Sequence, residues 1–309
     1  MKVLLATDGS KCSEEAAWVL SRLPHREKLE LTVLTVLSPP ATAFYSPTKD
    51  LMEEMVREDR AYAEKRQTVI AEMFEGANLD LSCEVIEGNA QETIVDLAKQ
   101  RDSDLIVIGA KGHSKIDRIL LGSTSDYVAT HAPCSVLVVR PTGLREDHER
   151  SLKVAVAFDD SPASNAALDE LLQFRWGAHT VIDVVAVAGY TPVFNPDFGF
   201  NPEALQREAQ KAVDIAAERL MEQVDQVEKN VIENDHIAEG LVRYSEQTGA
   251  DFLMIGDTGR SSIARVILGS VSRYVLRHAA CGVWITRHSR RTSSESTDHG
   301  GSENIPATS

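Results

Sequence analysis

The chain has 309 residues, of which 43% are hydrophobic and 26% are charged, proportions typical of a globular protein with room for two domains. Its formal net charge of −15 argues against general binding to nucleic-acid backbones, which requires a basic surface. Because no apolar run approaches transmembrane length and no targeting segment is evident, we expect a cytoplasmic protein that makes no membrane contact.

Short runs rich in Val, Leu and Ile alternate with longer helix-like segments along the first half of the chain. We expect strands at residues 2–7, 30–37, 81–86, 104–109 and 135–140, and helices at 13–23, 50–75, 90–101 and 123–131. The second half repeats this order, with strands near 153–158, 180–187, 229–233, 251–256 and 282–287. Alternation of buried strands with helices predicts a parallel sheet covered on both faces, once in each half.

The connecting segments are more polar than the two halves. We expect domains at residues 1–140 and 152–287, joined by a linker at 141–151 and followed by a disordered tail at 288–309. The loops at 38–47 and 189–202 are interpreted either as ordinary connectors or as covers over one end of the sheet.

A glycine pattern occurs once in each half. Gly109-Ala110-Lys111-Gly112 is followed by nine residues and then Gly122-Ser123, and Gly256-Asp257-Thr258-Gly259 is followed by nine residues and then Gly269-Ser270. Glycine permits tight turns and the close approach of a ligand. The N–H groups that begin the following helix can bind an anion. The pattern therefore predicts two phosphate-binding turns.

Other candidate residues follow the strands at the edge where a doubly wound sheet binds its ligands. An aspartate after each first strand can meet a ribose or a metal ion, and backbone groups beside the second strand can meet an adenine edge. Asp8 has the alternative role of capping the next helix or holding the Asp-Gly-Ser turn. The candidates in the first half are Ala6, Thr7, Asp8, Val36, Ile108, Gly109, Gly112, His113, Gly122, Ser123, Thr124 and Ser125. Those in the second half are Ala157, Phe158, Asp159, Val187, Ile255, Gly256, Gly259, Arg260, Gly269, Ser270, Val271 and Ser272.

The two copies of the site differ in bulk and charge. Phe158 replaces Thr7, and Asp160 replaces Gly9, so we expect the second site to be narrower and to repel phosphate. Asp257 adds another negative charge to the second loop. Lys111, Lys115 and Arg260 are either phosphate ligands or solvated surface charges. We therefore rank the first site ahead of the second.

The cysteines and two histidines are assigned structural roles. The four cysteines show no zinc-binding spacing and are expected to be reduced and partly buried, with Cys134 and Cys281 in the core or at an interface. His131 and His278 are expected at helix ends, where an imidazole can meet the last carbonyl groups.

Each half resembles the universal stress protein family in its Gly-x₂-Gly-x₉-Gly-Ser motif, in the aspartate after the first strand and in an Ala-x-Cys-x-Val ending. The resemblance covers about residues 1–140 and 152–287 and implies two tandem α/β domains, each with five parallel strands. It also implies dimers through the fifth strands and ATP binding in members that carry the complete motif. We expect two doubly wound, Rossmann-like sheets in the order 3-2-1-4-5, with ATP and Mg²⁺ bound in at least the first.

The fifth strands are expected at sheet edges. Because apolar edge strands need covering, we expect residues 136–139 and 283–286 to cover each other in an internal pseudo-dimer, and a homodimer is a further expectation.

Three functions remain open at this point. The first is an ATP-binding stress-response regulator whose conformation or assembly follows nucleotide occupancy. The second is an ATP-hydrolysing enzyme of related architecture, and the third is a dimerisation module without ligand. We predict the regulator, acting on an unspecified protein partner, because no carboxylate or glutamine is evidently aimed at an attacking water. Slow hydrolysis or transfer to Ser123 is compatible with this prediction.

Overall fold

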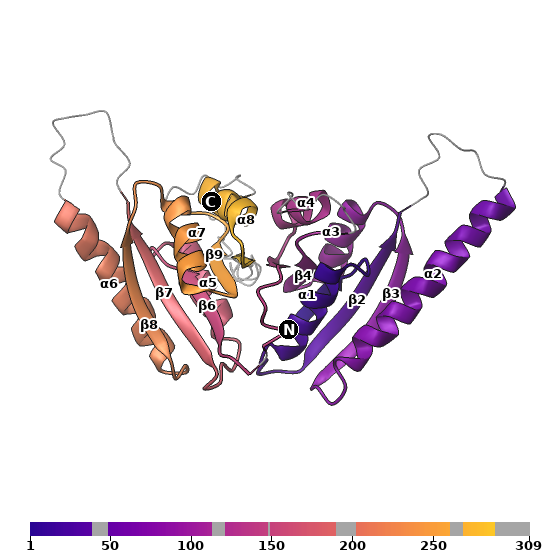
Figure 1. The fold of residues 1–309 in the computed structure, drawn as a ribbon, viewed down its shortest axis with the longest axis horizontal. Helices are drawn as coiled ribbons and strands as arrows, with labels where there is room; N and C mark the ends of the chain where they lie inside the picture. Colours follow the sequence, from indigo (N-terminus) through magenta and orange to yellow (C-terminus); the bar gives the residue numbers. More distant parts are fainter. Residues whose placement is uncertain (39–48, 113–120, 148, 190–201, 260–267, 288–309) are drawn as a thin grey trace, which may run out of the picture.

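Strands and helices alternate throughout the described residues of the computed structural model, which are 1–38, 49–112, 121–147, 149–189, 202–259 and 268–287 (Figure 1). The first half comprises β1 (Lys2–Ala6), α1 (Lys11–Arg22), β2 (Leu29–Leu37), α2 (Lys49–Glu72), β3 (Leu79–Glu87), α3 (Ala90–Gln100), β4 (Leu105–Gly109), α4 (Ser123–His131) and β5 (Ser135–Val139). The second half comprises β6 (Leu152–Ala157), α5 (Pro162–Leu171), β7 (Thr180–Ala188), α6 (Pro202–Met221), β8 (Val227–Glu233), α7 (Ile237–Thr248), β9 (Phe252–Gly256), α8 (Ser270–His278) and β10 (Gly282–Thr286). All the predicted strands are present, with small shifts at their ends.

The strands form a single continuous sheet in the order β3-β2-β1-β4-β5-β10-β9-β6-β7-β8. Within each half the strands are parallel and follow the predicted order 3-2-1-4-5. At the junction β5 and β10 pair in antiparallel fashion, with Trp284 opposite Leu137. The expected mutual covering of the fifth strands is therefore confirmed, and it merges the two predicted sheets into one. Each strand supplies the backbone partner that the other would otherwise lack.

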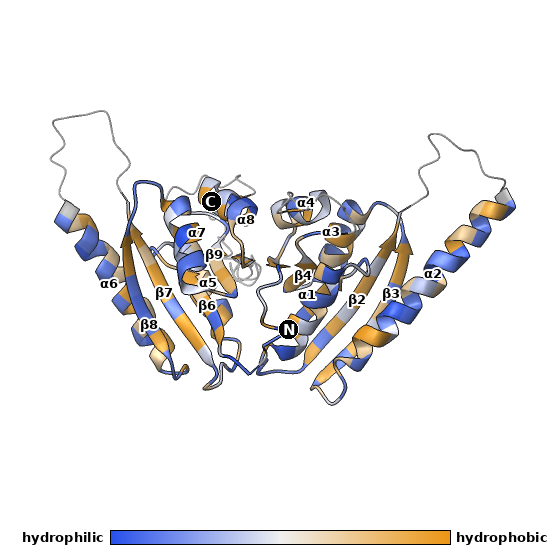
Figure 2. Ribbon diagram, in the orientation of Figure 1, coloured by the Kyte–Doolittle hydropathy of each residue, from blue (hydrophilic) through white to orange (hydrophobic). Residues whose placement is uncertain are grey.

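Helices cover both faces of this sheet, and each face has its own hydrophobic core. One core contains side chains from α1, α2, α5 and α6, and the other contains side chains from α3, α4, α7 and α8. Side chains alternate along each strand, so Val3 and Leu5 belong to the first core while Leu4 and Ala6 belong to the second. Inner strands such as β7 and β9 are largely apolar, whereas helices such as α2 and α6 carry both polar and apolar residues (Figure 2). Both cores extend across the junction between the halves.

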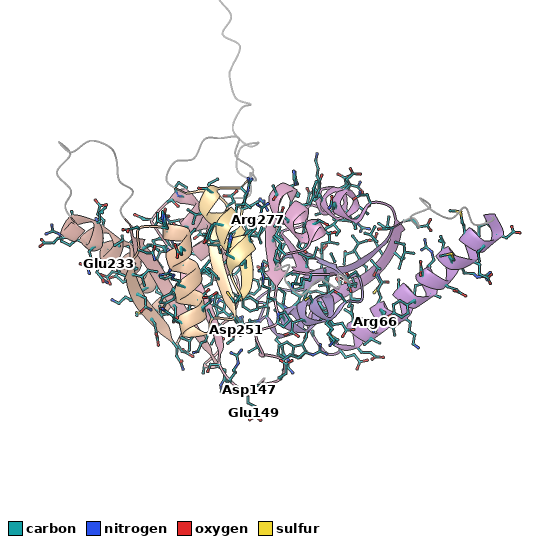
Figure 3. All side chains as sticks on the ribbon, turned by 45° about the horizontal axis from the view of Figure 1, so that its top comes forward. Arg66, Asp147, Glu149, Glu233, Asp251 and Arg277 are labelled. Atoms are coloured by element: carbon teal, nitrogen blue, oxygen red, sulfur yellow. The ribbon has the colours of Figure 1, made fainter. Side chains whose placement is uncertain are left out.

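The segment at 141–151 is anchored on a buried carboxylate of the second half. Asp251, labelled in Figure 3, has no exposed surface. It accepts hydrogen bonds from Thr142 Oγ1 (2.6 Å), from the Arg150 guanidinium (2.6 and 2.9 Å) and from the backbone N–H of Lys153 (3.0 Å). Burial of a charge is tolerated when hydrogen bonds and a counter-charge compensate it. Thr142 and Arg150 thus tie both ends of the linker to the second half.

Some expectations fall beyond the described residues. The predicted tail at 288–309 and all but the ends of the loops at 38–47 and 189–202 lie outside them. In the part of the chain that is described, no helix is both long and apolar enough to cross a bilayer.

Candidate functional site

A cavity of about 360 Å³ opens at the carboxyl ends of β1, β2 and β4 in the first half. Cavities that bind small molecules commonly have volumes of about 300–1,000 Å³. All first-half candidates except His113, which lies outside the described residues, line this cavity: Ala6, Thr7, Asp8, Val36, Ile108, Gly109, Gly112, Gly122, Ser123, Thr124 and Ser125. The fold therefore brings four separate stretches of sequence together around one space.

The second half has an equivalent cavity of about 500 Å³, as formed by the described residues. Its lining includes Ala157, Phe158, Asp159, Val187, Ile255, Gly256, Gly259, Gly269, Ser270, Val271 and Ser272, whereas Arg260 lies outside the described residues. The prediction that the second site is narrower is therefore wrong for the described part of the chain. The Phe158 side chain is only 2% exposed because it packs into the hydrophobic core rather than filling the cavity.

Asp160 also differs from its expected role. Its φ of 59° reproduces the left-handed conformation that Gly9 adopts at the equivalent turn, with φ of 78°. The Asp160 carboxylate accepts a hydrogen bond from Asn165 Nδ2 (3.1 Å) and is not part of the cavity lining. The expected repulsion of phosphate by this side chain is thus not supported, because the turn directs it elsewhere.

Asp8 and Asp159 hold the turns that follow β1 and β6. Asp8 Oδ1 accepts the backbone N–H of Ser10 (2.9 Å), and Asp159 Oδ1 accepts that of Ser161 (3.1 Å). The two serines, not the aspartates, cap α1 and α5. Asp8 Oδ2 faces the glycine loop, because a methyl group at position 112 would lie 2.5 Å from it. One carboxylate therefore serves both the turn and the cavity.

The glycines of the two motifs are required for different reasons. A Cβ at Gly109 would lie 2.6 Å from the carbonyl carbon of Cys12, and one at Gly256 would lie 2.7 Å from Ala163 Cβ. These two glycines thus allow α1 and α5 to pack closely on β4 and β9, in addition to lining the two cavities. A Cβ at Gly122 would lie 3.3 Å from the carbonyl oxygen of Ala110, so this glycine belongs to the tight loop itself.

The helices α4 and α8 begin at the cavities without a side-chain cap. Gly122 and Gly269 occupy their N-cap positions and make no capping hydrogen bond, whereas Asn89 caps α3 through its side chain. The first N–H groups of a helix have no partner within the helix, and they carry a partial positive charge. Both cavities therefore contain a helix terminus suited to an anion.

Two serines of these helices have a structural contact that the sequence did not reveal. Ser125 Oγ donates a hydrogen bond to the carbonyl of Gly109 and Ser272 Oγ donates one to that of Gly256, both at 2.7 Å. These bonds fix the first turn of α4 on β4 and of α8 on β9. Ser123 and Thr124 also line the first cavity and remain the predicted hydroxyl contacts of a phosphate.

Each cavity has an apolar wall on one side that the sequence motifs did not indicate. Ala90 and Ile94 of α3 contribute it in the first half, and Ile237 and Leu241 of α7 contribute it in the second. The sequence feature that could have predicted this wall is the pair of apolar residues, four positions apart, at the start of the third helix of each half. Other lining residues that were missed are Ser13, Leu34, Ser38, Ser161, Ser164, Val185 and Thr258.

The charges around the two cavities differ. Lys111 lines the first cavity, and its carbonyl oxygen accepts a hydrogen bond from Ser10 Oγ (3.2 Å). The described lining of the second cavity contains no lysine or arginine. Among the residues that the structure describes, no group of three or more His, Cys, Asp or Glu side chains could hold a metal ion.

The expected histidine contacts are confirmed, and one cysteine expectation is wrong. His131 Nδ1 lies 2.9 Å from the carbonyl oxygen of Tyr127, and His278 Nδ1 lies 2.7 Å from that of Tyr274. Cys134 and Cys281 are buried, as expected, and burial raises the pKa of Cys134 to about 12. Cys83 is exposed, because it lies on the edge strand β3.

Comparison with known proteins gives a consistent result over most of the chain. The profile of the universal stress protein family matches residues 1–140 and 151–287. A universal stress protein of Mycolicibacterium smegmatis is 27% identical over 296 residues, which cover 92% of this chain and 96% of the relative. A universal stress protein of Mycobacterium tuberculosis is 26% identical over 297 residues, covering 93% of this chain and 96% of the relative.

Solved structures show the same architecture. A universal stress protein from Archaeoglobus fulgidus matches with a TM-score of 0.61 and 20% sequence identity, covering 93% of this chain and 98% of that chain. At this level of identity the match concerns the fold, including both halves of the tandem.

Proposed function

Because the chain belongs to the universal stress protein family, we propose that it is a regulatory protein that binds ATP with Mg²⁺ and changes conformation or assembly with nucleotide occupancy. One observation carries this proposal: the uncapped N-terminus of α4 opens into a cavity at the carboxyl ends of the central strands. That position suits a phosphate chain, since helix N–H groups and the helix dipole both favour an anion.

The rest of the first cavity suits a nucleoside. Its apolar side, which includes Val36 and Ile94, offers a surface for an adenine ring, and Asp8 can accept hydrogen bonds from a ribose. Ser123 and Thr124 would then meet the phosphates together with Lys111. The Gly-x₂-Gly-x₉-Gly-Ser motif, which resembles that of the ATP-binding members, supports the same orientation.

The residues of the cavity fit a Mg²⁺ ion that arrives with the nucleotide. Mg²⁺ prefers oxygen ligands and is commonly held by one or two carboxylates together with substrate phosphates. Because Asp8 is assigned to the ribose, the hydroxyl oxygens of Ser123 and Thr124, which lie beside the phosphate position, are the lining oxygens that would help to complete the shell of an ion bound to the phosphates. Bound there, the ion would neutralise phosphate charge in a protein whose formal net charge is −15.

We assign the higher affinity to the first site. Lys111 supplies a cation there, whereas the described lining of the second cavity has none. The second cavity is larger and retains Asp159, Gly269 and Ser270 at equivalent positions. It is therefore proposed as a weaker ATP site rather than a closed one.

Regulation is favoured over catalysis by the side chains near the phosphate end. Rapid hydrolysis needs a positioned water molecule and a general base. Asp8 is the one carboxylate in the described lining of the first cavity, and its Oδ1 already holds the turn at Ser10.

We propose two tandem domains at 1–140 and 152–287, a cytoplasmic location, a role in the response to stress and signalling through a protein partner.

The test combines nucleotide identification with a matched pair of variants. Mass spectrometry of the denatured protein should identify ATP, and calorimetry should measure its affinity with Mg²⁺. Gly122→Val should weaken binding at the first site, because its side chain crowds the loop beside the helix terminus. Gly177→Val is the control, since nothing lies within 4 Å of a Cβ there.

The possible outcomes separate the three functions. ATP that stays intact supports the regulator, and turnover on the order of 1 per second or faster identifies an enzyme instead. A protein that binds no ATP is a dimerisation module. Equal affinity of wild-type protein and a folded Gly122→Val variant would remove the first cavity as the site.

A further inference from the structure

Two arginines that follow the fifth strands reach across the junction between the halves. Arg287, after β10, donates hydrogen bonds to the carbonyls of Ala129 (2.6 Å), Thr130 (3.3 Å) and Cys134 (3.0 Å) in the first half. Arg140, after β5, donates hydrogen bonds to the carbonyls of Leu276 (2.6 Å) and Cys281 (3.2 Å) in the second half. Each arginine therefore holds the C-terminal end of a helix that belongs to the other half.

These guanidinium groups are bound by backbone rather than by side-chain carboxylates. Burial lowers the pKa of both Arg140 and Arg287, yet a guanidinium stays protonated in proteins. The last carbonyls of a helix carry partial negative charge and lack partners within the helix. The arginine charge and the helix end thus compensate each other inside the protein, and the helix end is fixed in place.

The helices held in this way are those that begin at the two cavities. With nine residues each, α4 and α8 are about 13 Å long, short enough to move as rigid rods. Ser125 and Ser272 fix their first turns to β4 and β9. A displacement at the arginine-bound end would therefore change the direction of the N–H groups at the other end.

A third contact joins the two helices directly. Arg277, in the last turn of α8, binds the carboxylate of Asp126 in the first turn of α4, at 3.2 Å from Nε and 3.0 Å from Nη2. Arg277 lies at the junction of the two halves (Figure 3). Asp126 follows Ser125 directly, so this contact lies beside the first phosphate-binding turn.

We propose that Arg287 and Arg140 are positioning residues for nucleotide, each acting on the site in the opposite half. Arg287 orients α4 and so the first site, and Arg140 orients α8 and so the second. This inference rests on the proposed ATP binding. It goes further in making each site dependent on a residue of the other domain.

The test measures the two sites separately. The Gly269→Val variant weakens the second site, so that binding at the first can be measured alone. The Gly122→Val variant weakens the first site, so that binding at the second can be measured alone. In these backgrounds, calorimetry should show that Arg287→Met weakens ATP binding at the first site by at least about fivefold and leaves the second within about twofold. Arg140→Met should give the reverse pattern. A purely structural role would instead lower the thermal stability of both variants and affect the two sites alike.

Several results would overturn this inference. Equal effects at both sites, or an effect at the site of the arginine's own half, would refute it. If the buried variants do not fold, the half-exposed Arg277→Ala variant should weaken the first site alone. Absence of ATP binding by wild-type protein would refute the proposed function instead. Hydrogen exchange would then test positioning by itself, with faster exchange in α4 for Arg287→Met and in α8 for Arg140→Met.

An independent observation concerns an exposed side of α2. Leu51, Met55, Tyr62 and Val69 are 40% to 57% exposed, and their spacing places them along one side of this helix. In the described part of α6, which occupies the equivalent position, Met221 is the one large hydrophobic side chain with similar exposure. We call the four residues of α2 the α2 stripe.

The charges beside the α2 stripe match a second copy of the same helix. Glu58 and Lys65 are exposed, lie seven residues apart and therefore flank the stripe on the same side. If a second α2 lies antiparallel with Tyr62 on the two-fold axis, Met55 lies opposite Val69, and Glu58 lies close to Lys65. Because β5 and β10 already cover each other, a second chain cannot pair with either strand.

We also infer that the α2 stripe binds the α2 stripe of a second copy of this chain, which gives an antiparallel, isologous homodimer. Analytical ultracentrifugation should find a dimer for the wild-type chain and a monomer for Tyr62→Glu. Glu58→Lys and Lys65→Glu should each weaken the dimer, and the double variant should restore it. Met221→Glu is the control and should remain dimeric.

Two results would overturn this second inference. If the wild-type chain is monomeric at all concentrations, the α2 stripe does not bind a second copy, and its partner would be a different protein. A dimer that persists in Tyr62→Glu, or double variants without restored affinity, would show that another surface is used.

Discussion

The carboxyl group of Glu170 should make the stability of this protein depend on pH near neutrality. Glu170 lies in α5 at the junction, where its carboxylate accepts hydrogen bonds from Ser135 Oγ (2.5 Å) and Trp284 Nε1 (2.7 Å). Burial raises its pKa from 4.5 to about 7, against the lowering effect of these two bonds, and the charge of Asp104 raises it further. Glu170 thus joins the two halves, and above its pKa it carries a negative charge that burial disfavours.

The sign of the effect follows from proton binding. In the unfolded chain this carboxyl loses its proton near pH 4.5, whereas in the folded chain it keeps the proton until about pH 7. The folded state therefore binds more protons between these values, so the free energy of unfolding falls as pH rises from 4.5 to 7. The difference in pKa corresponds to at most about 3 kcal/mol, fully lost above pH 7.

Glu170→Gln removes this dependence with little change of shape. The amide oxygen can accept the Trp284 N–H, and the amide nitrogen can donate to Ser135 Oγ. Urea unfolding at pH 5, 6, 7 and 8 should show the wild-type free energy of unfolding declining relative to that of the variant. Exposed Glu218→Gln is the control and should follow the wild type. Parallel pH curves for wild type and Glu170→Gln would refute the reasoning.

Three further predictions follow from buried groups. Asp251→Ala should lower the free energy of unfolding by about 1–3 kcal/mol, because it leaves the Thr142 hydroxyl and the Lys153 N–H without their acceptor and Arg150 without its counter-charge, and unchanged stability in urea titrations would contradict this. Gly109→Ala should cost about 1–3 kcal/mol in the same assay, since its Cβ would push α1 away from β4; unchanged stability would show that the helix yields freely. Iodoacetamide should label exposed Cys83 before buried Cys134, whose pKa is raised to about 12, and mass spectrometry showing equal labelling would disprove this order.

The sequence by itself determined the elements and most of the candidate site. Strands such as Leu105–Gly109 are marked by short apolar runs, and the spacing of Gly109, Gly112 and Gly122 marks the loop between β4 and α4. These signals are local, because the conformation of a strand or a turn depends on residues near each other in the chain. The repeat of the same pattern then established two domains of one kind.

Only the tertiary structure decided what the individual side chains do. Gly109 is required by the carbonyl group of Cys12, and the Glu170 carboxylate meets Ser135 and Trp284. The first cavity similarly needs a wall from α3, and each helix that begins at a cavity ends at an arginine of the opposite half. These contacts join residues that are mostly far apart in sequence. Their formation depends on how the helices and strands pack, for which a single sequence contains no local pattern.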